Sequence, residues 1–278
     1  MPKKLSRHGA AVLMLFITSI LWSTSGFLIK LVDWHPMAIA GVRSAIALIP
    51  IIIAYGPPKR MKGFTQIGAA VCYSVTLLLF VSANKMTTAA NVILLQYSAP
   101  IYVIILSGPM LKEKVKLRDV ITVCVVVAGL ALFFFEQLDA DGIIGNILAL
   151  VSAVTLAFMM IFLRKEKDGT PMNSVIWGNI FTFIAGLPFI FTNGTPDSTS
   201  WIGLTLLGLF QLGLSYVIYM KALPHITTVE TALVPIIEPL LSPTFVALTT
   251  GEIPGALPFV GGLIVVTGVT VNLAAKRK

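Results

Sequence analysis

The chain has 278 residues, of which 56% are hydrophobic and only 12% are charged, and its mean hydropathy is +0.92. A soluble domain carries about 25% charged residues, so this composition excludes a water-soluble globular protein. The net charge is +8, but the basic residues lie in short loops between apolar runs, which indicates membrane topology and not nucleic-acid binding.

Long apolar runs divide the chain into ten predicted transmembrane helices. A hydrocarbon core about 30 Å thick needs about 20 apolar residues per helix, and lipid offers no partner for an unpaired backbone group, so each span must be helical. The first run is too long for a signal peptide and lacks a cleavage site, so we expect a retained helix. The predicted spans are 9–31, 36–55, 64–83, 87–110, 119–135, 143–163, 172–192, 201–220, 226–249 and 257–275.

Basic residues are distributed unevenly between the predicted loops. With the N-terminus in the cytoplasm, the cytoplasmic segments contain 17 of the 20 Lys and Arg residues. This bias predicts a multi-pass protein of the plasma (inner) membrane with both termini in the cytoplasm. The cytoplasmic segments would be 1–8, 56–63, 111–118, 164–171, 221–225 and 276–278.

The chain also contains an internal repeat. An offset of 139 residues aligns matching residues in the third to fifth and eighth to tenth predicted spans without a gap. The matched pairs are Ala83 with Ala222, Thr88 with Thr227, Leu94 with Leu233, Pro100 with Pro239, Glu113 with Glu252 and Gly129 with Gly268. The repeats would be residues 1–138 and 139–278. Each holds five spans, an odd number, so the second half would be inserted upside down relative to the first, as in many secondary transporters.

Pro100 and Pro239 fall in the middle of the fourth and ninth predicted spans. A proline inside a helix removes a backbone hydrogen bond and kinks the helix. Such breaks are tolerated at membrane depth where protein or a water-filled cavity receives the freed groups. Paired breaks favour a binding cavity between the two halves, although each proline alone is equally compatible with a packing kink.

These residues resemble the EamA-type branch of the drug/metabolite transporter superfamily. The pattern is a small-residue-rich helix start, a proline and a closing Lys-Glu or Gly-Glu. It reads Thr87-Thr88-Ala89-Ala90-Asn91, Ala99-Pro100 and Lys112-Glu113, and again Ile226-Thr227-Thr228-Val229-Glu230, Glu238-Pro239 and Gly251-Glu252. The resemblance covers essentially the whole chain. It implies an all-α fold of ten transmembrane helices in two inverted five-helix repeats, a central cavity and export of small metabolites. The first copy has Ala99 where the second has Glu238, so any carboxylate role must come from the second half.

Ionisable residues inside a bilayer are usually functional or paired. Arg43 lies in the second predicted span, and Glu230 and Glu238 lie in the ninth. Eight residues of α-helix separate the two carboxylates by about 80° and about 12 Å, so both can face one cavity. Arg43 would bind substrate, pair with Glu230 or Glu238, or extend its stem to the interface. Glu238 would bind an ammonium group or a proton, or form a structural ion pair or an interhelical hydrogen bond.

Uncharged polar residues complete the candidate site. The sequence predicts Trp22, Asn91, Gln96, Tyr97 and Gln211 as substrate-binding residues beside the three ionisable ones, with Asn179 and Tyr216 as further candidates. An interhelical hydrogen bond is the ordinary alternative for each. The histidines and cysteines have no metal-ligand spacing, so no metal site, cofactor or catalytic residue is predicted.

The predicted function is secondary transport of small polar metabolites such as amino acids or amines, by alternating access around the cavity. Arg43 together with a carboxylate would suit a zwitterion. Proton coupling and uncoupled diffusion are both compatible with the residues, as are a monomer and a homodimer. The predicted partners are a small-molecule substrate and the lipid bilayer. The alternatives are an intramembrane enzyme, for which no catalytic cluster is visible, and a scaffold subunit, which would gain nothing from paired helix breaks.

Overall fold

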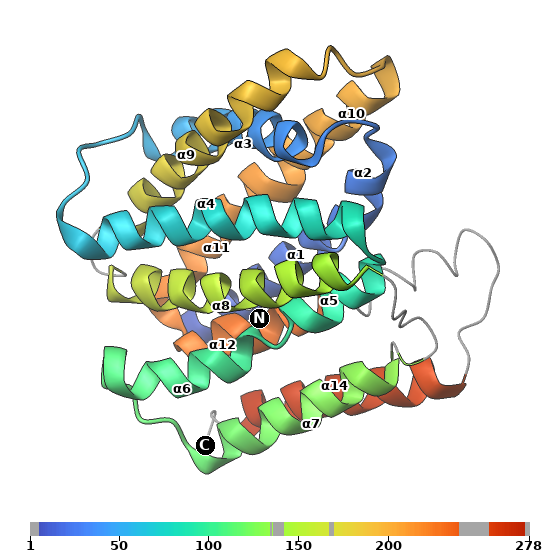
Figure 1. Cartoon of the computed structure of the whole chain (residues 1–278). Coiled ribbons are helices and arrows are strands. Elements are labelled where there is room, and N and C mark those ends of the chain that lie inside the picture. The colour runs from blue at the N-terminus through green and yellow to red at the C-terminus, as the bar shows by residue number, and fades with distance from the viewer. Residues whose placement is uncertain (1–5, 134, 136–141, 167–169, 239–255, 276–278) are drawn as a thin grey trace, which may run out of the picture.

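The fold is known from a computed structural model that describes residues 6–133, 135, 142–166, 170–238 and 256–275. These residues form helices joined by short turns, and no strand occurs within those ranges. The helices lie side by side in layers, with α7 and α14 together at one edge (Figure 1).

The elements are, in chain order, α1 (Arg7–Trp22), α2 (Ser25–Leu31), α3 (Pro36–Tyr55), α4 (Gly63–Met86), α5 (Ala89–Gln96), α6 (Ala99–Leu111), α7 (Leu117–Phe133), α8 (Ile143–Lys165), α9 (Pro171–Thr192), α10 (Ser198–Leu206), the π-helix η2 (Leu207–Leu214), α11 (Ser215–Ala222), the 3₁₀ helix η3 (Leu223–His225), α12 (Thr228–Leu233), the 3₁₀ helix η4 (Val234–Ile237) and α14 (Ala256–Ala275).

Seven helices within the described ranges are long and apolar enough to cross a membrane, three of them built from consecutive elements. They coincide with the first four and the sixth to eighth predicted spans. The helices α7 and α14 lie at the fifth and tenth, and α12 with η4 begins the ninth. Residues 239–249 of the ninth span lie outside the described residues. The described part of the chain is therefore all-helical and of the multi-pass membrane type, and the ten-helix inverted repeat stays a prediction.

Hydroxyl caps fix where several helices begin. The Thr88 hydroxyl accepts a hydrogen bond from the backbone N–H of Asn91, at 3.2 Å. The Thr227 hydroxyl accepts one from the N–H of Glu230 at 3.3 Å, and the Glu230 carboxylate accepts one from the N–H of Thr227 at 2.7 Å. This reciprocal pair is a capping box. The two caps are 139 residues apart, so equivalent positions of the repeat start helices by the same chemistry.

The helix pairs follow a pattern that agrees with two related halves. α3 packs against α9 and α7 against α14, while α4 packs against α8 and α1 against α11. Exchanging the halves in the predicted repeat maps the first two pairs onto themselves and α4–α8 onto α11–α1. A two-fold axis produces this kind of self-matching contact pattern.

The interface between α7 and α14 contains two equivalent glycine–valine contacts. A Cβ at Gly129 would come within 2.9 Å of the Val265 side chain, and a Cβ at Gly268 would lie 3.3 Å from Val126. Val265 and Gly268 are the 139-residue counterparts of Val126 and Gly129. Glycine at both positions lets the two helices approach closely, and the reciprocity supports a two-fold relation between them.

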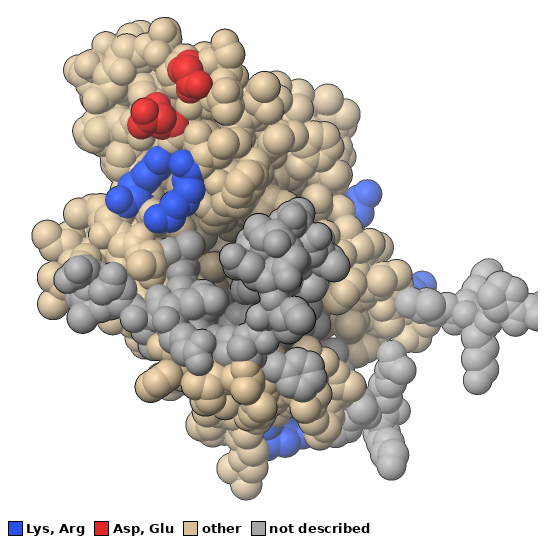
Figure 2. Space-filling view, turned by 90° about the vertical axis from the view of Figure 1, so that its right-hand side faces the viewer, with Lys and Arg blue, Asp and Glu red and all other residues tan. Residues whose placement is uncertain are grey.

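Large apolar side chains are exposed on the outer surface, while the interior holds polar side chains beside a larger number of apolar ones. Ile53 and Phe191 are each 81% exposed, whereas Ser44, Asn84 and Thr182 are fully buried. So many exposed large apolar side chains suit contact with lipid. Figure 2 views the end of the molecule where α2 ends and α8 begins, and most of the described surface there is uncharged.

Candidate functional site

A small cavity lies among interrupted helices from both halves of the chain. Its volume is about 100 Å³. Its walls are mostly apolar, with a few polar side chains directed into it, as is typical of ligand sites. The lining residues are Trp22, Ser25, Arg43, Thr76, Leu77, Phe80, Gln96, Tyr97, Ala99, Pro100, Leu156, Met160, Gln211, Leu212, Tyr216, Pro235 and Glu238.

Backbone irregularities surround this cavity. The first span is interrupted between α1 and α2, the fourth between α5 and α6, the eighth by the π-helix η2, and α12 passes into η4. Irregular backbone at membrane depth is tolerated where it lines a cavity or is covered by protein, and π-helical turns often occur at functional sites. The convergence of four such irregularities makes this cavity the leading candidate for a substrate site.

The interruption in the fourth span lies just before Pro100. α5 ends at Gln96, and α6 begins at Ala99 with Pro100 in its first turn. A proline is accommodated in a first turn because its missing N–H would have no partner there in any case. Pro100 therefore starts the second half of a broken helix. Its counterpart Pro239 lies outside the described residues.

Arg43, on α3, is the most deeply buried charge in the cavity wall. It is 1% exposed, and its Nε and Nη1 atoms have no hydrogen-bond partner among the described residues. It forms no ion pair with Glu230 or Glu238. Glu230 contacts His8 instead, and Glu238 bonds to Tyr97. Its burial also excludes a guanidinium extended to the membrane interface.

Glu238 faces the same cavity from the second half of the chain. It follows η4 and is half-buried. The hydroxyl of Tyr97 donates a hydrogen bond to Glu238 Oε2 and lies 2.9 Å from the carbonyl oxygen of Pro235. Tyr97 is at the interruption between α5 and α6, so this bond joins the broken helix of the first half to the irregular segment of the second.

Trp22, Gln96 and Gln211 complete the polar wall. The indole N–H of Trp22 donates to the Ser215 hydroxyl at 2.8 Å, and Gln96 donates to the Ser152 hydroxyl at 3.3 Å. The Oε1 atom of Gln211 is buried without a partner among the described residues. Six of the eight predicted binding residues thus line one cavity, together with Tyr216.

Asn91 and Glu230 do not line it. Asn91 donates to Asn146 at 3.1 Å, at the start of α8, while Glu230 accepts from the Thr227 cap and lies 3.0 Å from His8. The 80° separation of Glu230 from Glu238 assumed continuous α-helix, but the segment changes to a 3₁₀ helix at Val234. Glu230 instead completes the capping box of α12, and the Asn91 side chain bonds Thr87 and Asn146 beside the start of α5. Asn179 also lies elsewhere, donating to the Tyr73 hydroxyl at 3.0 Å.

Sequence reasoning missed Ser25 and Thr76, which line the cavity. Thr76 bonds its own helix at Cys72 and also Thr155 of α8, at 2.7 and 2.8 Å. The run Ser23-Thr24-Ser25 in the middle of an apolar span was a usable signal, because such side chains compensate for interrupted backbone. The π-helix had no comparable signal beyond Gly208 and Gly213.

A second, polar pocket of about 630 Å³ lies at one end of the bundle. Two contacts in its wall join the halves of the chain: His8 Nε2 lies 3.0 Å from Glu230 Oε1, and Arg164 forms an ion pair with Glu113 at 2.8 Å. Arg164 also donates to the Leu223 carbonyl at 2.9 Å. By the predicted topology this pocket is at the cytoplasmic end.

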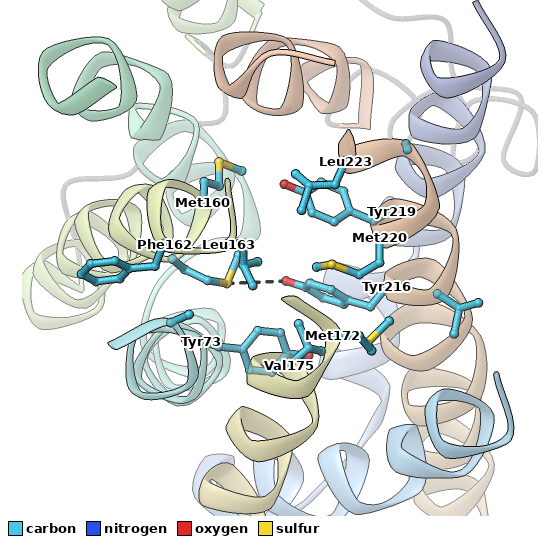
Figure 3. Packing of buried hydrophobic residues seen from close by; sticks show 14 of the residues in the cluster. Tyr73, Met160, Phe162, Leu163, Met172, Val175, Tyr216, Tyr219, Met220 and Leu223 are labelled. Carbon is cyan, nitrogen blue, oxygen red and sulfur yellow. Dashed lines mark hydrogen bonds between the residues drawn. The ribbon is translucent and has the colours of Figure 1, made fainter. Parts of the chain in front are cut away.

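An apolar cluster lies between the two hollows. It includes Leu77, Met160, Leu212 and Tyr216 of the cavity wall and Ile226 of the polar pocket. Figure 3 shows Tyr216, Tyr219, Met220 and Leu223 on one helical segment facing Met160, Leu163 and Tyr73 on others. The rings of Tyr73 and Tyr216 are 5.0 Å apart. The cluster thus contributes side chains to the walls of both hollows.

Comparison with known proteins identifies two copies of one family domain. The model of the EamA-like transporter family matches residues 9–135 and 143–274. These two stretches cover nearly the whole chain, and each contributes one side of the cavity.

Several curated transporters are similar along much of their length. An uncharacterized transporter of Archaeoglobus fulgidus is 24% identical over 95% of this chain and 96% of its own. A protein of Escherichia coli named "Probable amino-acid metabolite efflux pump" is 22% identical over 98% of this chain and 97% of its own. The biotin transporter of Escherichia coli is 23% identical over 73% of each chain. These relatives are named as transporters and not as enzymes.

A solved crystal structure has the same fold. It superposes with a TM-score of 0.82 over 98% of this chain and 100% of that one, at 17% sequence identity. At this identity the likeness concerns the fold alone.

Proposed function

Because the chain belongs to the EamA-like transporter family, we propose that it is a secondary transporter that exports small polar metabolites, such as amino acids or amines, across the plasma membrane. Both termini would lie in the cytoplasm. The proposal makes the cavity lined by Trp22, Arg43, Gln96, Tyr97, Gln211 and Glu238 the substrate site.

The observation that carries this proposal is the position of the cavity. It is bounded by interrupted helices from both halves, and the halves meet across it through Tyr97 and Glu238. In transporters built from inverted repeats, substrate sites lie at the repeat interface and are formed by discontinuous helices. An enzyme or a scaffold subunit has no need for this arrangement.

Alternating access follows from two related halves around one site. At the end of the bundle with the polar pocket, the apolar cluster, the His8–Glu230 hydrogen bond and the Arg164–Glu113 ion pair hold the halves together. Opening the cavity toward that end requires these contacts to separate. A few side-chain contacts can control this motion, because the free energies of the two conformations of the protein differ by only a few kcal/mol.

Glu238 is the carboxylate best placed to bind the substrate or to carry a proton. Its Oε2 atom already accepts from Tyr97, and the side chain borders the cavity. A substrate ammonium group would be attracted to it, and proton exchange at this carboxylate would couple transport to the proton gradient. An uncoupled facilitator would use the same carboxylate for binding only.

The experiment is flux in liposomes. Purified protein is reconstituted, and counterflow of labelled small amino acids and amines is compared with that of empty liposomes, at several pH values. We expect Glu238→Gln to abolish flux or to remove its pH dependence while the protein still elutes and melts as the parent does.

Glu166→Gln is the matched control. Glu166 lies just after α8, accepts from Gln66 at 2.9 Å and does not border the cavity, so its variant should keep parental flux. Normal and equally pH-dependent flux in Glu238→Gln would remove the proposed role of that carboxylate. Absence of flux above empty liposomes for every compound would contradict the proposed function.

A further inference from the structure

Arg43 is a positive charge held inside the protein without a compensating protein group among the described residues. It is 1% exposed, and Nε and Nη1 are both buried and unbonded there. A buried charge without a partner is strongly unfavourable, so such groups are normally paired or serve a ligand. The nearest protein explanations fail, because neither Glu230 nor Glu238 forms an ion pair with it.

Neighbouring residues pack tightly against Arg43. Gly208 of η2 packs on the backbone of Arg43, where a Cβ would come within 2.9 Å of its carbonyl oxygen. The same π-helix carries Gln211, whose Oε1 atom is also buried and without a partner among the described residues. Arg43 and Gln211 therefore line one cavity from two packed elements, and each carries buried polar atoms without a partner among the described residues, donors on one and an acceptor on the other.

We propose that Arg43 is the carboxylate-binding residue of this cavity and that its ligands are small amino acids and not plain amines. The inference rests on the proposed function for the identity of the site. The guanidinium matches a carboxylate with two parallel N–H bonds. Gln211 Oε1 and the Glu238 carboxylate then face the amino group, and Leu77, Phe80 and Leu212 cover the apolar body.

The size of the cavity sets the size of the ligand. On this measure one water molecule needs about 10–15 Å³, so a volume of about 100 Å³ accommodates a molecule as small as alanine or valine. A phosphate dianion fits less well, because one guanidinium beside the Glu238 carboxylate would leave its second charge uncompensated.

The test measures binding in detergent, separately from flux. The probes are alanine, valine and leucine, each paired with the amine that lacks its carboxylate: ethylamine, isobutylamine and isopentylamine. Inorganic phosphate is a further probe. We expect saturable binding of at least one amino acid to the wild-type protein, and no detectable binding of its matched amine or of phosphate.

Two variants separate charge from shape. Arg43→Met should weaken amino-acid binding by about 10- to 100-fold, the usual effect of losing hydrogen bonds to a charged group. Arg43→Lys, which keeps the charge without the fork, should lie in between. Because replacing an unpaired buried charge by an apolar side chain does not destabilise a fold, Arg43→Met should melt at or above the parental temperature. Lys30→Met, which removes an exposed charge, should bind as the parent does.

Each possible result either supports or contradicts the proposed role of Arg43. Equal binding of amine and amino acid, parental affinity in Arg43→Met, or no binding of any amino acid would overturn it. Flux of amines with no preference for amino acids would overturn it while leaving the proposed function in place. Selective binding of amino acids without flux would support the inference and contradict transport.

Discussion

The Tyr97 hydroxyl and the Glu238 carboxylate join the two halves of the chain at the wall of the cavity. Tyr97 aligns with residue 236 at the 139-residue offset, two positions before Glu238, so nearly equivalent places in the two halves meet each other. The hydroxyl has one proton, which it shares between Glu238 and the carbonyl oxygen of Pro235, 2.9 Å away. A contact of this kind must break if the halves separate around the cavity.

Tyr97→Phe should therefore open the cavity more often. Losing one side-chain hydrogen bond changes an equilibrium by about 0.5–1.5 kcal/mol, which predicts labelling of a cavity cysteine about two- to tenfold faster. The measurement is thiol labelling of Ser25→Cys in a chain whose Cys72 and Cys124 are replaced by alanine. Tyr55→Phe is the control, because that hydroxyl bonds the Val217 carbonyl at 3.4 Å and does not border the cavity. Equal labelling rates in both variants would show that the Tyr97 contact is not a gate.

The bond between Arg164 and Glu113 predicts an order of stabilities. Arg164→Met should destabilise the protein more than Glu113→Gln, because Arg164 also donates to the Leu223 carbonyl at 2.9 Å. For Glu113→Gln we expect a loss of up to about 1 kcal/mol, since the carboxylate is partly exposed and an exposed ion pair contributes little. Unfolding in detergent by a denaturing surfactant measures both. The double variant should lose less than the two single losses combined, and strict additivity would mean that the two groups do not interact.

Some structural features could be predicted from the sequence and others could not, depending on the physical force that determines each one. Span positions were predictable because the bilayer imposes length and hydropathy on each segment. The interruption before Pro100 was visible as a proline within a span, and Arg43 and Glu238 stood out as charges at membrane depth. The interruption between α1 and α2 was not foreseen, although its backbone is satisfied locally: the Ser23 and Thr24 hydroxyls donate to the carbonyl oxygens of Ile20 and Leu21.

Glu230 shows the limit of reasoning from helical periodicity. Its spacing to Glu238 allowed a shared cavity, but the Thr227-x-x-Glu230 sequence is also a capping box, and the local hydrogen bonds determine where the carboxylate lies. The Asn91 side chain is likewise held by neighbours at the start of its helix, Thr87 and Asn146, although it completes no capping box. The buried and unsatisfied state of Gln211 could not be predicted either, since it depends on the π-helix and on the packing of η2 against α3.

The two glycines of the α7–α14 contact should respond differently to substitution, although they are equivalent in the repeat. In Gly129→Ala the new Cβ meets Val265 at 2.9 Å, Ile264 at 3.0 Å and the Gly261 carbonyl oxygen at 3.1 Å, whereas in Gly268→Ala its closest neighbour is Val126 at 3.3 Å. Overpacking of a close contact costs about 1–3 kcal/mol, while alanine in a helix regains up to about 1 kcal/mol over glycine. Gly129→Ala should lower the melting temperature and Gly268→Ala should leave it nearly unchanged. The opposite order would mean that α7 and α14 do not pack as described.

The inverted arrangement makes a prediction about sidedness. Lys59, in the loop after α3, and Thr195, in the loop after α9, follow equivalent spans of the two halves and are both exposed. If the second half is inserted upside down, the two positions face opposite sides of the membrane. Cysteines introduced singly at Lys59 and Thr195, in the chain lacking Cys72 and Cys124, are labelled with a membrane-impermeant thiol reagent in intact cells and in inverted vesicles. We expect Thr195→Cys to react in cells and Lys59→Cys only in inverted vesicles. Labelling of both from the same side would contradict the inverted repeat, and with it alternating access between two opposed halves.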